Sequence, residues 1–261
     1  MAALALAGAG AALALRTGGG SHHLTAPKHQ PRLPAWLARW TLVATLPAGT
    51  AGYADPSAPN PTTLVASSWA GTPTALPVLA SQPGWIEVSL LAPPRAVTPI
   101  TWIRSAGVSV TQTPYRIVVD LARTRLLLFR NAKLVRCAPA AVGTAAQPTP
   151  FGHFFVSLLA PAPTAAYGAF VIVTSATANT VTDWQRSGLP TITIEGPLGS
   201  DAAIGTGGAP VTNGSVRLLA QDLNGLRGVP LGTPVDIVPG LRVPRSARHL
   251  PRHHRASAGC A

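Results

Sequence analysis

Alternating apolar and polar positions run through the second half of the chain and predict strands rather than long helices. Isoleucines alternate with threonines in "LPTITIEG" (residues 189–196), as in a half-buried strand. Three strands are predicted in "YRIVVDLARTRLLLFRNAKLVRCAPAAVG", which begins at Tyr115, with turns at Leu121–Thr124 and Asn131–Ala132. Further strands are predicted in "GHFFVSLLA", "GAFVIVTS" and "GTPVDIV", and one short helix in "LAQDLNGLRG" (219–228).

Shorter apolar pieces, broken by proline, glycine and serine, fill residues 41–113. Two strands joined by a Pro-Gly turn are predicted in "LPVLASQPGWIEVSLL", and the second of them carries Trp85 and Val88. Another strand is predicted in "PITWIRSAGV", which contains Trp102. We interpret these tryptophans as core residues rather than as stacking platforms for a ligand. Short strands at close spacing with turn signals predict a small β-barrel or sandwich.

The two ends of the chain lack this strand pattern. Residues 2–15, "AALALAGAGAALAL", are an apolar run that is too short to span a bilayer and resembles the apolar part of a secretory signal, although no basic residue precedes it. We therefore interpret 1–40 as a signal-like segment and linker, and we expect an exported protein of the cell wall or the extracellular space. Residues 240–261 contain five arginines and no acid, and they predict a basic disordered tail.

The charge of the protein is concentrated in these ends. The 261 residues carry a net charge of +12, whereas residues 115–238 hold nine basic and six acidic side chains, a balance of 9 − 6 = +3. Basic ends predict attraction to anionic wall polymers or to a membrane surface, and the plainer alternative is that they are solvated tails. No nucleic acid partner is expected, because aromatic and basic residues are not interleaved.

Several motifs in fixed order give the chain a family resemblance. They are the opening "YRIVVDLARTRLLLFRNAKLV", the segment "AVGTAAQPTPFGHFFV", the pair Tyr167–Gly168 and "GTPVDIV" at 232–238. In this order they resemble the L,D-transpeptidase (YkuD-type) catalytic domain of bacterial cell-wall enzymes. Residues 41–113 are similar to the small SH3-like module that precedes this domain in actinobacterial members. The resemblance implies a mainly β fold, in which an L,D-transpeptidase-like β-sandwich or barrel (114–239) follows an SH3-like β module.

The chemistry of this family depends on a His-Gly pair and, some sixteen residues later, on the motif Ser/Thr-His-Gly-Cys-x-Arg. The cysteine attacks the acyl donor peptide to form a thioester, and the histidine before it accepts the thiol proton. In this chain Glu195–Gly196 stands at the His-Gly position, and sixteen residues separate Glu195 from Thr212. The motif then continues as Thr212, Asn213, Gly214, Ser215, Val216 and Arg217.

The reactive side chains of the motif are therefore replaced while its spacing is kept. The resemblance assigns Ser215 to the nucleophile position, Asn213 to the base position and Glu195 to the position of the pocket histidine. It assigns substrate binding to Gly196, Thr212, Gly214 and Arg217. We expect a catalytically degenerate relative that binds or senses peptidoglycan stem peptides, or that supports an active enzyme. The alternatives are an active acyl transferase that uses Ser215 and a gene product without a retained task.

Other candidate groups have simpler interpretations. His153 is expected to be a surface residue of a strand, and the alternative is a base recruited to Ser215. Glu195 could serve Ser215 as a base only if burial raised its pKa. Arg217 could bind carbonyls of its own loop or a carboxylate of the substrate. Cys137 is most simply a small buried apolar residue, although a bridge to Cys260 is possible, and no metal or cofactor is predicted.

Overall fold

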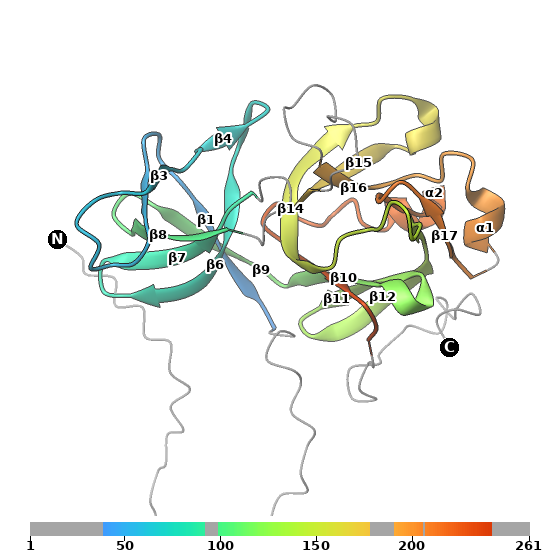
Figure 1. Ribbon diagram of the computed structural model, residues 1–261, viewed down its shortest axis with the longest axis horizontal. Helices are drawn as coiled ribbons and strands as arrows, with labels where there is room; N and C mark the ends of the chain where they lie inside the picture. Colours follow the sequence, from blue (N-terminus) through green and yellow to red (C-terminus); the bar gives the residue numbers. More distant parts are fainter. Residues whose placement is uncertain (1–38, 92–98, 178–190, 206, 242–261) are drawn as a thin grey trace, which may run out of the picture. The chain divides into compact units, whose positions relative to one another are not determined.

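The computed structural model describes residues 39–91, 99–177, 191–205 and 207–241. Within these residues the chain forms a seven-stranded sheet, a ten-stranded sheet and a two-stranded sheet, with only short helices (Figure 1). The predicted mainly β fold is confirmed. The predicted signal-like segment up to residue 38 and the tail from residue 242 lie outside the described residues. None of the helices in the described part of the chain has the length and apolar character needed to cross a membrane.

The seven-stranded sheet contains the strands predicted for residues 41–113, in the order β3-β2-β8-β7-β6-β1-β9. The predicted Pro-Gly turn joins β6 to β7, where Gly84 has a φ of +80°, a left-handed conformation that favours glycine. Whether this module is SH3-like stays a prediction. The strands are β1 (Thr41–Thr45), β2 (Ala51–Tyr53), β3 (Thr63–Leu64), β6 (Ala75–Gln82), β7 (Trp85–Ser89), β8 (Ile100–Arg104) and β9 (Ser109–Thr113), and the two-stranded sheet pairs β4 (Ser68–Trp69) with β5 (Thr72–Pro73).

The tryptophans of this sheet differ in burial. Trp85 is buried, lies edge-on to Tyr53 with the ring centroids 5.1 Å apart, and has the Arg104 guanidinium 3.9 Å above its ring. Trp102 on β8 is only half-buried. The interpretation of the tryptophans as core residues is therefore confirmed for Trp85 and holds only in part for Trp102. Trp102 is less buried because its neighbours on β8, Thr101 and Ile103, take the inward positions of the alternating strand.

The ten-stranded sheet has the order β12-β11-β10-β19-β14-β15-β16-β18-β13-β17. The predicted turn at Asn131–Ala132 joins β11 to β12, and both residues have positive φ, as in a type I′ hairpin. The strands are β10 (Tyr115–Asp120), β11 (Arg125–Arg130), β12 (Lys133–Pro139), β13 (Ala141–Gly143), β14 (Gly152–Pro161), β15 (Phe170–Thr177), β16 (Thr191–Glu195), β17 (Ala209–Thr212), β18 (Val216–Arg217) and β19 (Pro234–Val238).

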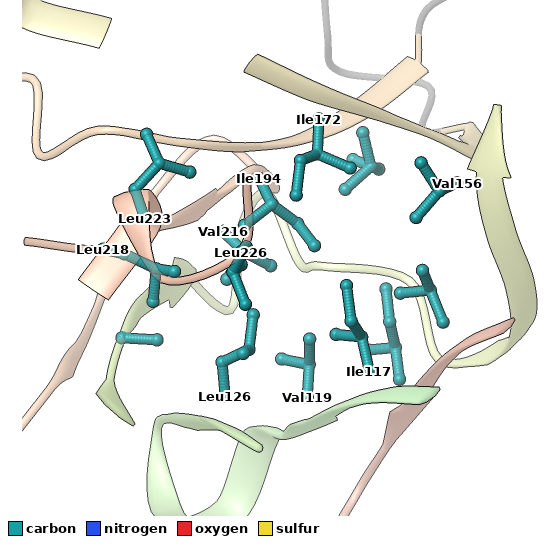
Figure 2. Close-up of a cluster of buried hydrophobic side chains, with 14 of the residues drawn as sticks. Ile117, Val119, Leu126, Val156, Ile172, Ile194, Val216, Leu218, Leu223 and Leu226 are labelled. Carbon is teal, nitrogen blue, oxygen red and sulfur yellow. The ribbon is translucent and has the colours of Figure 1, made fainter. Parts of the chain in front are cut away.

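The main apolar core lies against this sheet. Figure 2 shows Ile117, Val119 and Leu126 facing Ile194, Val216 and the leucines that follow β18. Leu223 belongs to α2 (Ala220–Asn224). This helix is shorter than the predicted 219–228, because the turns after Asn224 continue with single i to i−3 hydrogen bonds. The structure also contains a helix that the sequence did not predict, α1 (Asp201–Gly205).

Strand β16 is more deeply placed than its sequence pattern predicted. All five of its residues are buried, so the prediction of a half-buried strand is wrong. The reason is its position between β15 and β18 inside the sheet, with both faces covered. Ile192 and Ile194 point into the apolar core. Because side chains alternate along a strand, Thr193 and Glu195 share the opposite face, beside the start of β18.

Cys137 lies on β12 and is half-buried against a small apolar cluster that includes Leu127 and Leu134. Its interpretation as a small buried apolar residue holds only in part, because Cys137 is half-buried and disulfide-bonded. No cysteine in the described residues is free. The second cysteine, Cys260, lies outside the described residues.

Candidate functional site

The loop between β17 and β18, which we call the Ser215 loop, contains the residues predicted for the nucleophile and base positions. Thr212 Oγ1 donates to the carbonyl oxygen of Ser215 at 2.6 Å and accepts from the N–H of Gly214 at 3.1 Å. Gly214 has a φ of +113°, which favours glycine at this point of the turn. The buried Thr212 side chain therefore fixes the loop internally, so that Thr212 and Gly214 have structural roles here.

A second threonine anchors this loop to the rest of the domain. Thr149, in the "PTPFG" segment before β14, donates its hydroxyl to the carbonyl oxygen of Gly214 at 2.6 Å and accepts from the N–H of Gly143 at 2.8 Å. It is 4% exposed. Sequence reasoning identified this segment as a family motif without assigning Thr149 a role. A buried hydroxyl needs partners, which is the physical reason for its place between two backbone segments.

Glu195 ends β16 and is almost fully buried, at 4% exposure. Its Oε2 accepts a hydrogen bond from Thr193 Oγ1 at 2.5 Å, and its Oε1 lies 3.4 Å from Nε of Arg217, which is directly opposite on the parallel strand β18. Burial raises the pKa of Glu195 above its ordinary value, and the Thr193 hydrogen bond and Arg217 oppose this rise only in part.

Ser215 is connected to this carboxylate through one hydroxyl. Ser215 Oγ lies 2.9 Å from Thr193 Oγ1 and is half-buried. A threonine hydroxyl has one proton, and Thr193 donates it to Glu195, so Ser215 is the donor in the contact with Thr193. The three side chains therefore form a continuous chain of hydrogen bonds, Ser215 to Thr193 to Glu195. Sequence reasoning missed Thr193, although its i, i+2 relation to Glu195 on a strand could have placed it on the same face.

The remaining predicted site residues lie around this chain of hydrogen bonds. Asn213 is exposed at the tip of the loop. Arg217 is half-buried and donates from Nη1 to Ser200 Oγ at 3.1 Å, in addition to its contact with Glu195. The side-chain contacts of Arg217 are thus made to a hydroxyl and a carboxylate, and the expectation that it binds carbonyls of its own loop is replaced by these partners.

The backbone of Tyr167 and Gly168 lies so close to Gly196 that only glycine fits at this position. Its N–H donates to the carbonyl oxygen of Tyr167 at 2.7 Å, and a Cβ at this position would lie 2.5 Å from the carbonyl carbon of Tyr167. The Tyr167–Gly168 motif therefore lies directly beside the Glu195–Gly196 motif. Tyr167 ends a short 3₁₀ helix (Ala165–Tyr167), so this helix and β16 meet at a point where a side chain cannot fit.

His153 belongs to a different cluster. It lies on β14, its side chain is 78% exposed, and its Nδ1 is 2.6 Å from Oδ1 of Asp236 on β19. The expectation of a surface strand residue is confirmed. A cavity of about 440 Å³ adjoins this cluster, and its lining includes His153, Asp236 and the exposed Trp40 but none of the residues of the Ser215 loop.

Comparison with known protein families finds a match for part of the chain. Residues 114–237 match the family model of the YkuD L,D-transpeptidase catalytic domain. This segment is similar to that family. The Ser215 loop and the Glu195–Gly196 pair both lie within the matched residues of the L,D-transpeptidase domain. A search of curated protein sequences finds no match to the chain.

The chain is also similar in structure to several solved L,D-transpeptidases. An Enterococcus faecium L,D-transpeptidase C442S mutant matches at 18% identity and a TM-score of 0.35, over 48% of this chain and 49% of that one. An L,D-transpeptidase from Mycobacterium smegmatis matches at 14% identity and 0.38, over 59% and 90%. L,D-transpeptidase 3 from Mycobacterium tuberculosis matches at 12% identity and 0.39, over 59% and 91%. The chain thus covers about half of the E. faecium protein.

Proposed function

We propose that this protein is an L,D-transpeptidase-like protein of the cell wall that binds peptidoglycan stem peptides at the Ser215 loop and lacks thiol-based cross-linking. The supporting observation is that the loop is fixed by hydrogen bonds, while the resemblance assigns Ser215 and Asn213 to the thiol and imidazole positions. A serine hydroxyl is far less acidic than a thiol, and an amide side chain does not accept a proton near neutral pH. The loop is therefore organised without the pair that activates a thiol.

The location of the protein is part of this proposal. An apolar run at 2–15 and a wall-enzyme domain are both expected of an exported protein. The basic ends of the chain would add a second, electrostatic attraction to anionic wall polymers or to the membrane surface. Salt screens this attraction, whereas hydrogen bonds between the loop and a peptide depend much less on the salt concentration.

A second candidate function is an active acyl transferase in peptidoglycan cross-linking that uses Ser215 in place of cysteine. One observation favours it, namely the 2.9 Å contact of Ser215 Oγ with Thr193 Oγ1, which connects the hydroxyl to a buried carboxylate. The two candidates agree on the place where substrate binds. They differ in whether a covalent bond to Ser215 forms.

Binding can be tested with the full chain and a soluble stem tetrapeptide by titration calorimetry, beside sedimentation with insoluble peptidoglycan. Both measurements are made in dilute buffer and in about 1 M NaCl, where the screening length falls to about 3 Å. The matched variants are Gly214→Val, which places a branched side chain at a φ of +113° in the loop, and Gly228→Ala, where a Cβ meets nothing within 4 Å.

We expect binding to survive in high salt, to weaken at least tenfold in Gly214→Val and to be unchanged in Gly228→Ala. Circular dichroism checks that both variants remain folded. Loss of all binding of the wild-type protein in high salt would mean that only the basic ends bind the wall. Equal binding by Gly214→Val and the wild-type protein would place the binding site elsewhere on the chain.

A further inference from the structure

We propose that Ser215 is the nucleophile of a serine-type acyl-transfer site in which Thr193 passes the serine proton to Glu195, and that its substrates are esters or thioesters rather than amides. This inference deepens the second candidate function, and it rests on the proposed function only for the location of the site. It gives a role to Thr193, a residue outside the family motifs named above, and to the glutamate that replaces a histidine.

The geometry carries the proton route. Ser215 Oγ is 2.9 Å from Thr193 Oγ1, and Thr193 Oγ1 is 2.5 Å from Glu195 Oε2. Both contacts are within the ordinary range for O–H···O hydrogen bonds. Because Thr193 donates to the carboxylate, its lone pairs are available to the serine proton. Among the described residues, Thr193 is the hydrogen-bond partner of the Ser215 side chain, so the hydroxyl is directed toward the base.

Burial makes the glutamate a stronger base than an exposed carboxylate. Glu195 is 4% exposed and Thr193 is 2% exposed, so neither side chain is solvated as it would be at the surface. The nearest cation, Arg217, makes a long contact of 3.4 Å and is itself half-buried, which leaves the carboxylate only partly neutralised. The pKa of Glu195 is accordingly raised, which brings the group closer to the range in which general bases act at neutral pH.

The reaction balances with these groups and water alone. Ser215 Oγ attacks the acyl carbon and forms a C–O bond, its proton moves to Thr193 Oγ1, and the proton of Thr193 moves to Glu195 Oε2. The bond from the acyl carbon to the leaving oxygen or sulfur breaks, and the leaving group departs as an anion, which gives an acyl-serine ester. Water then attacks this ester and loses one proton to the solvent. As the ester C–O bond breaks, Glu195 returns its proton through Thr193 to Ser215 Oγ, and the carboxylic acid is released with the second proton of the water.

The choice of esters over amides follows from the leaving group. An aryloxide or thiolate can depart without a proton, whereas an amine must be protonated as its C–N bond breaks. Here the only acid connected to Ser215 within the described residues is the protonated Glu195, and its route ends at Ser215 Oγ. Asn213, at the position of the family's imidazole, cannot supply a proton of suitable acidity. The site therefore suits acyl donors with acidic leaving groups.

The test uses the full chain and two probes. A fluorophosphonate reacts with activated serines, with loss of fluoride, and intact-mass spectrometry with peptide mapping identifies the labelled residue. Nitrophenyl acetate reports acyl transfer by release of nitrophenolate. The variants are Ser215→Ala, Thr193→Val and Thr193→Ser. The matched control is Thr191→Val on the same face of β16, because Thr191 Oγ1 is buried and has no hydrogen-bond partner among the described residues.

We expect stoichiometric labelling at Ser215 and no labelling in Ser215→Ala. The rate of both reactions should fall by about 10²-fold or more in Thr193→Val, the usual worth of a positioned base. It should recover to within a few-fold of wild type in Thr193→Ser, which restores the hydroxyl, and stay unchanged in Thr191→Val. A merely structural role of Thr193 would not produce this rescue at equal thermal stability.

Two outcomes overturn the inference: no labelling of Ser215 in the wild-type protein, or equal rates in folded Thr193→Val and wild type. If Thr193→Val fails to fold, Glu195→Gln takes its place and should lower the rate by a similar factor. The stem-peptide titration separates the two proposals. Binding without labelling overturns this inference alone, and labelling without binding overturns the proposed function alone.

Discussion

Two buried carboxylates in the same sheet, Asp236 and Glu195, have different sets of partners. The oxygens of Asp236 on β19 lie 2.5 Å from Nη1 of Arg116 and 2.6 Å from Nδ1 of His153. Those of Glu195 on β16 accept from the Thr193 hydroxyl at 2.5 Å and lie 3.4 Å from Arg217. Both side chains are at most 5% exposed.

Because their partners differ, Asp236 is suited to stabilise the fold, whereas Glu195 is suited to accept a proton. Asp236 lies beside the mostly buried Arg116, so its negative charge compensates a cation that could not otherwise be buried. Glu195 has a weaker ionic partner and a hydroxyl, and that hydroxyl leads to Ser215. A carboxylate at the same depth thus has two different uses, decided by the groups around it. Substitutions at the two positions should therefore have different effects.

The largest expected effect is on stability, at Asp236. Asp236→Ala leaves the guanidinium of Arg116, which is 13% exposed, without its carboxylate. Breaking a buried ion pair on one side costs about 3–5 kcal/mol, and we expect a loss near the lower end in the free energy of unfolding, measured by urea titration. The fluorophosphonate labelling rate at Ser215 should be unchanged wherever the variant is folded.

Two further variants show whether the loss comes from the unpaired cation. His153→Ala removes a partner that is 78% exposed and should change stability by less than about 1 kcal/mol. The double variant Arg116→Met, Asp236→Ala removes both charges and should recover part of the loss. If Asp236→Ala were no less stable than His153→Ala, the structural role assigned to Asp236 would be wrong.

A smaller effect is expected next to the other carboxylate. Gly196→Ala places a Cβ 2.5 Å from the carbonyl carbon of Tyr167 and 2.6 Å from the nitrogen of Gly168, so the backbone must move. We expect a loss of about 1–3 kcal/mol in urea titration together with slower labelling of Ser215, because Glu195 precedes the displaced residue. Gly228→Ala, with nothing within 4 Å of its Cβ, is the control. Labelling at the wild-type rate despite lower stability would show that the position of Glu195 is not coupled to this contact.

The sequence was sufficient to predict most strands of the ten-stranded sheet, although β16 is the only one of β16, β17 and β18 that was predicted. The hairpin turn at Asn131–Ala132 and the strands that flank it are local features, decided by turn chemistry and alternation. The strand "TITIE" was also predicted, but its burial on both faces was not, because burial depends on β15 and β18, which are distant in the sequence. Strands as short as β18, with two residues, have too little pattern to detect.

The sequence proposed candidate site residues one by one, but not the network of hydrogen bonds that connects three of them. The motif spacing placed Glu195 and Ser215 at corresponding family positions, and the structure brings both within hydrogen-bonding distance of Thr193. The sequence left open whether Glu195 could act on Ser215, since this depends on a third side chain and on burial. Alternation along β16 places Thr193 on the same face as Glu195, but it places Thr191 on that face as well. The parallel pairing of β16 with β18 is what brings Thr193, rather than Thr191, next to Ser215.

The smallest expected effect is the pH dependence of stability at Glu195. Its pKa is raised in the folded protein, so the folded state keeps a proton that the unfolded chain loses once the pH exceeds the ordinary value of 4.5. From that point the wild-type protein should lose stability relative to Glu195→Gln, until the pH passes the raised pKa of the folded state. Each unit by which the pKa is raised corresponds to about 1.4 kcal/mol. Urea titrations of both proteins from pH 4 to pH 8 measure this difference.

Asp55 provides a comparison of opposite sign. Hydrogen bonds from Ser57 lower the pKa of this exposed carboxyl, so the wild-type protein should gain stability relative to Asp55→Asn as the pH rises through the acidic range. The two difference curves should therefore slope in opposite directions, and the one for Glu195 should extend to higher pH. A flat curve for Glu195→Gln would mean that the buried carboxylate binds its proton no more tightly than a solvated one. Glu195 would then be no better suited than an exposed glutamate to accept the proton of Ser215.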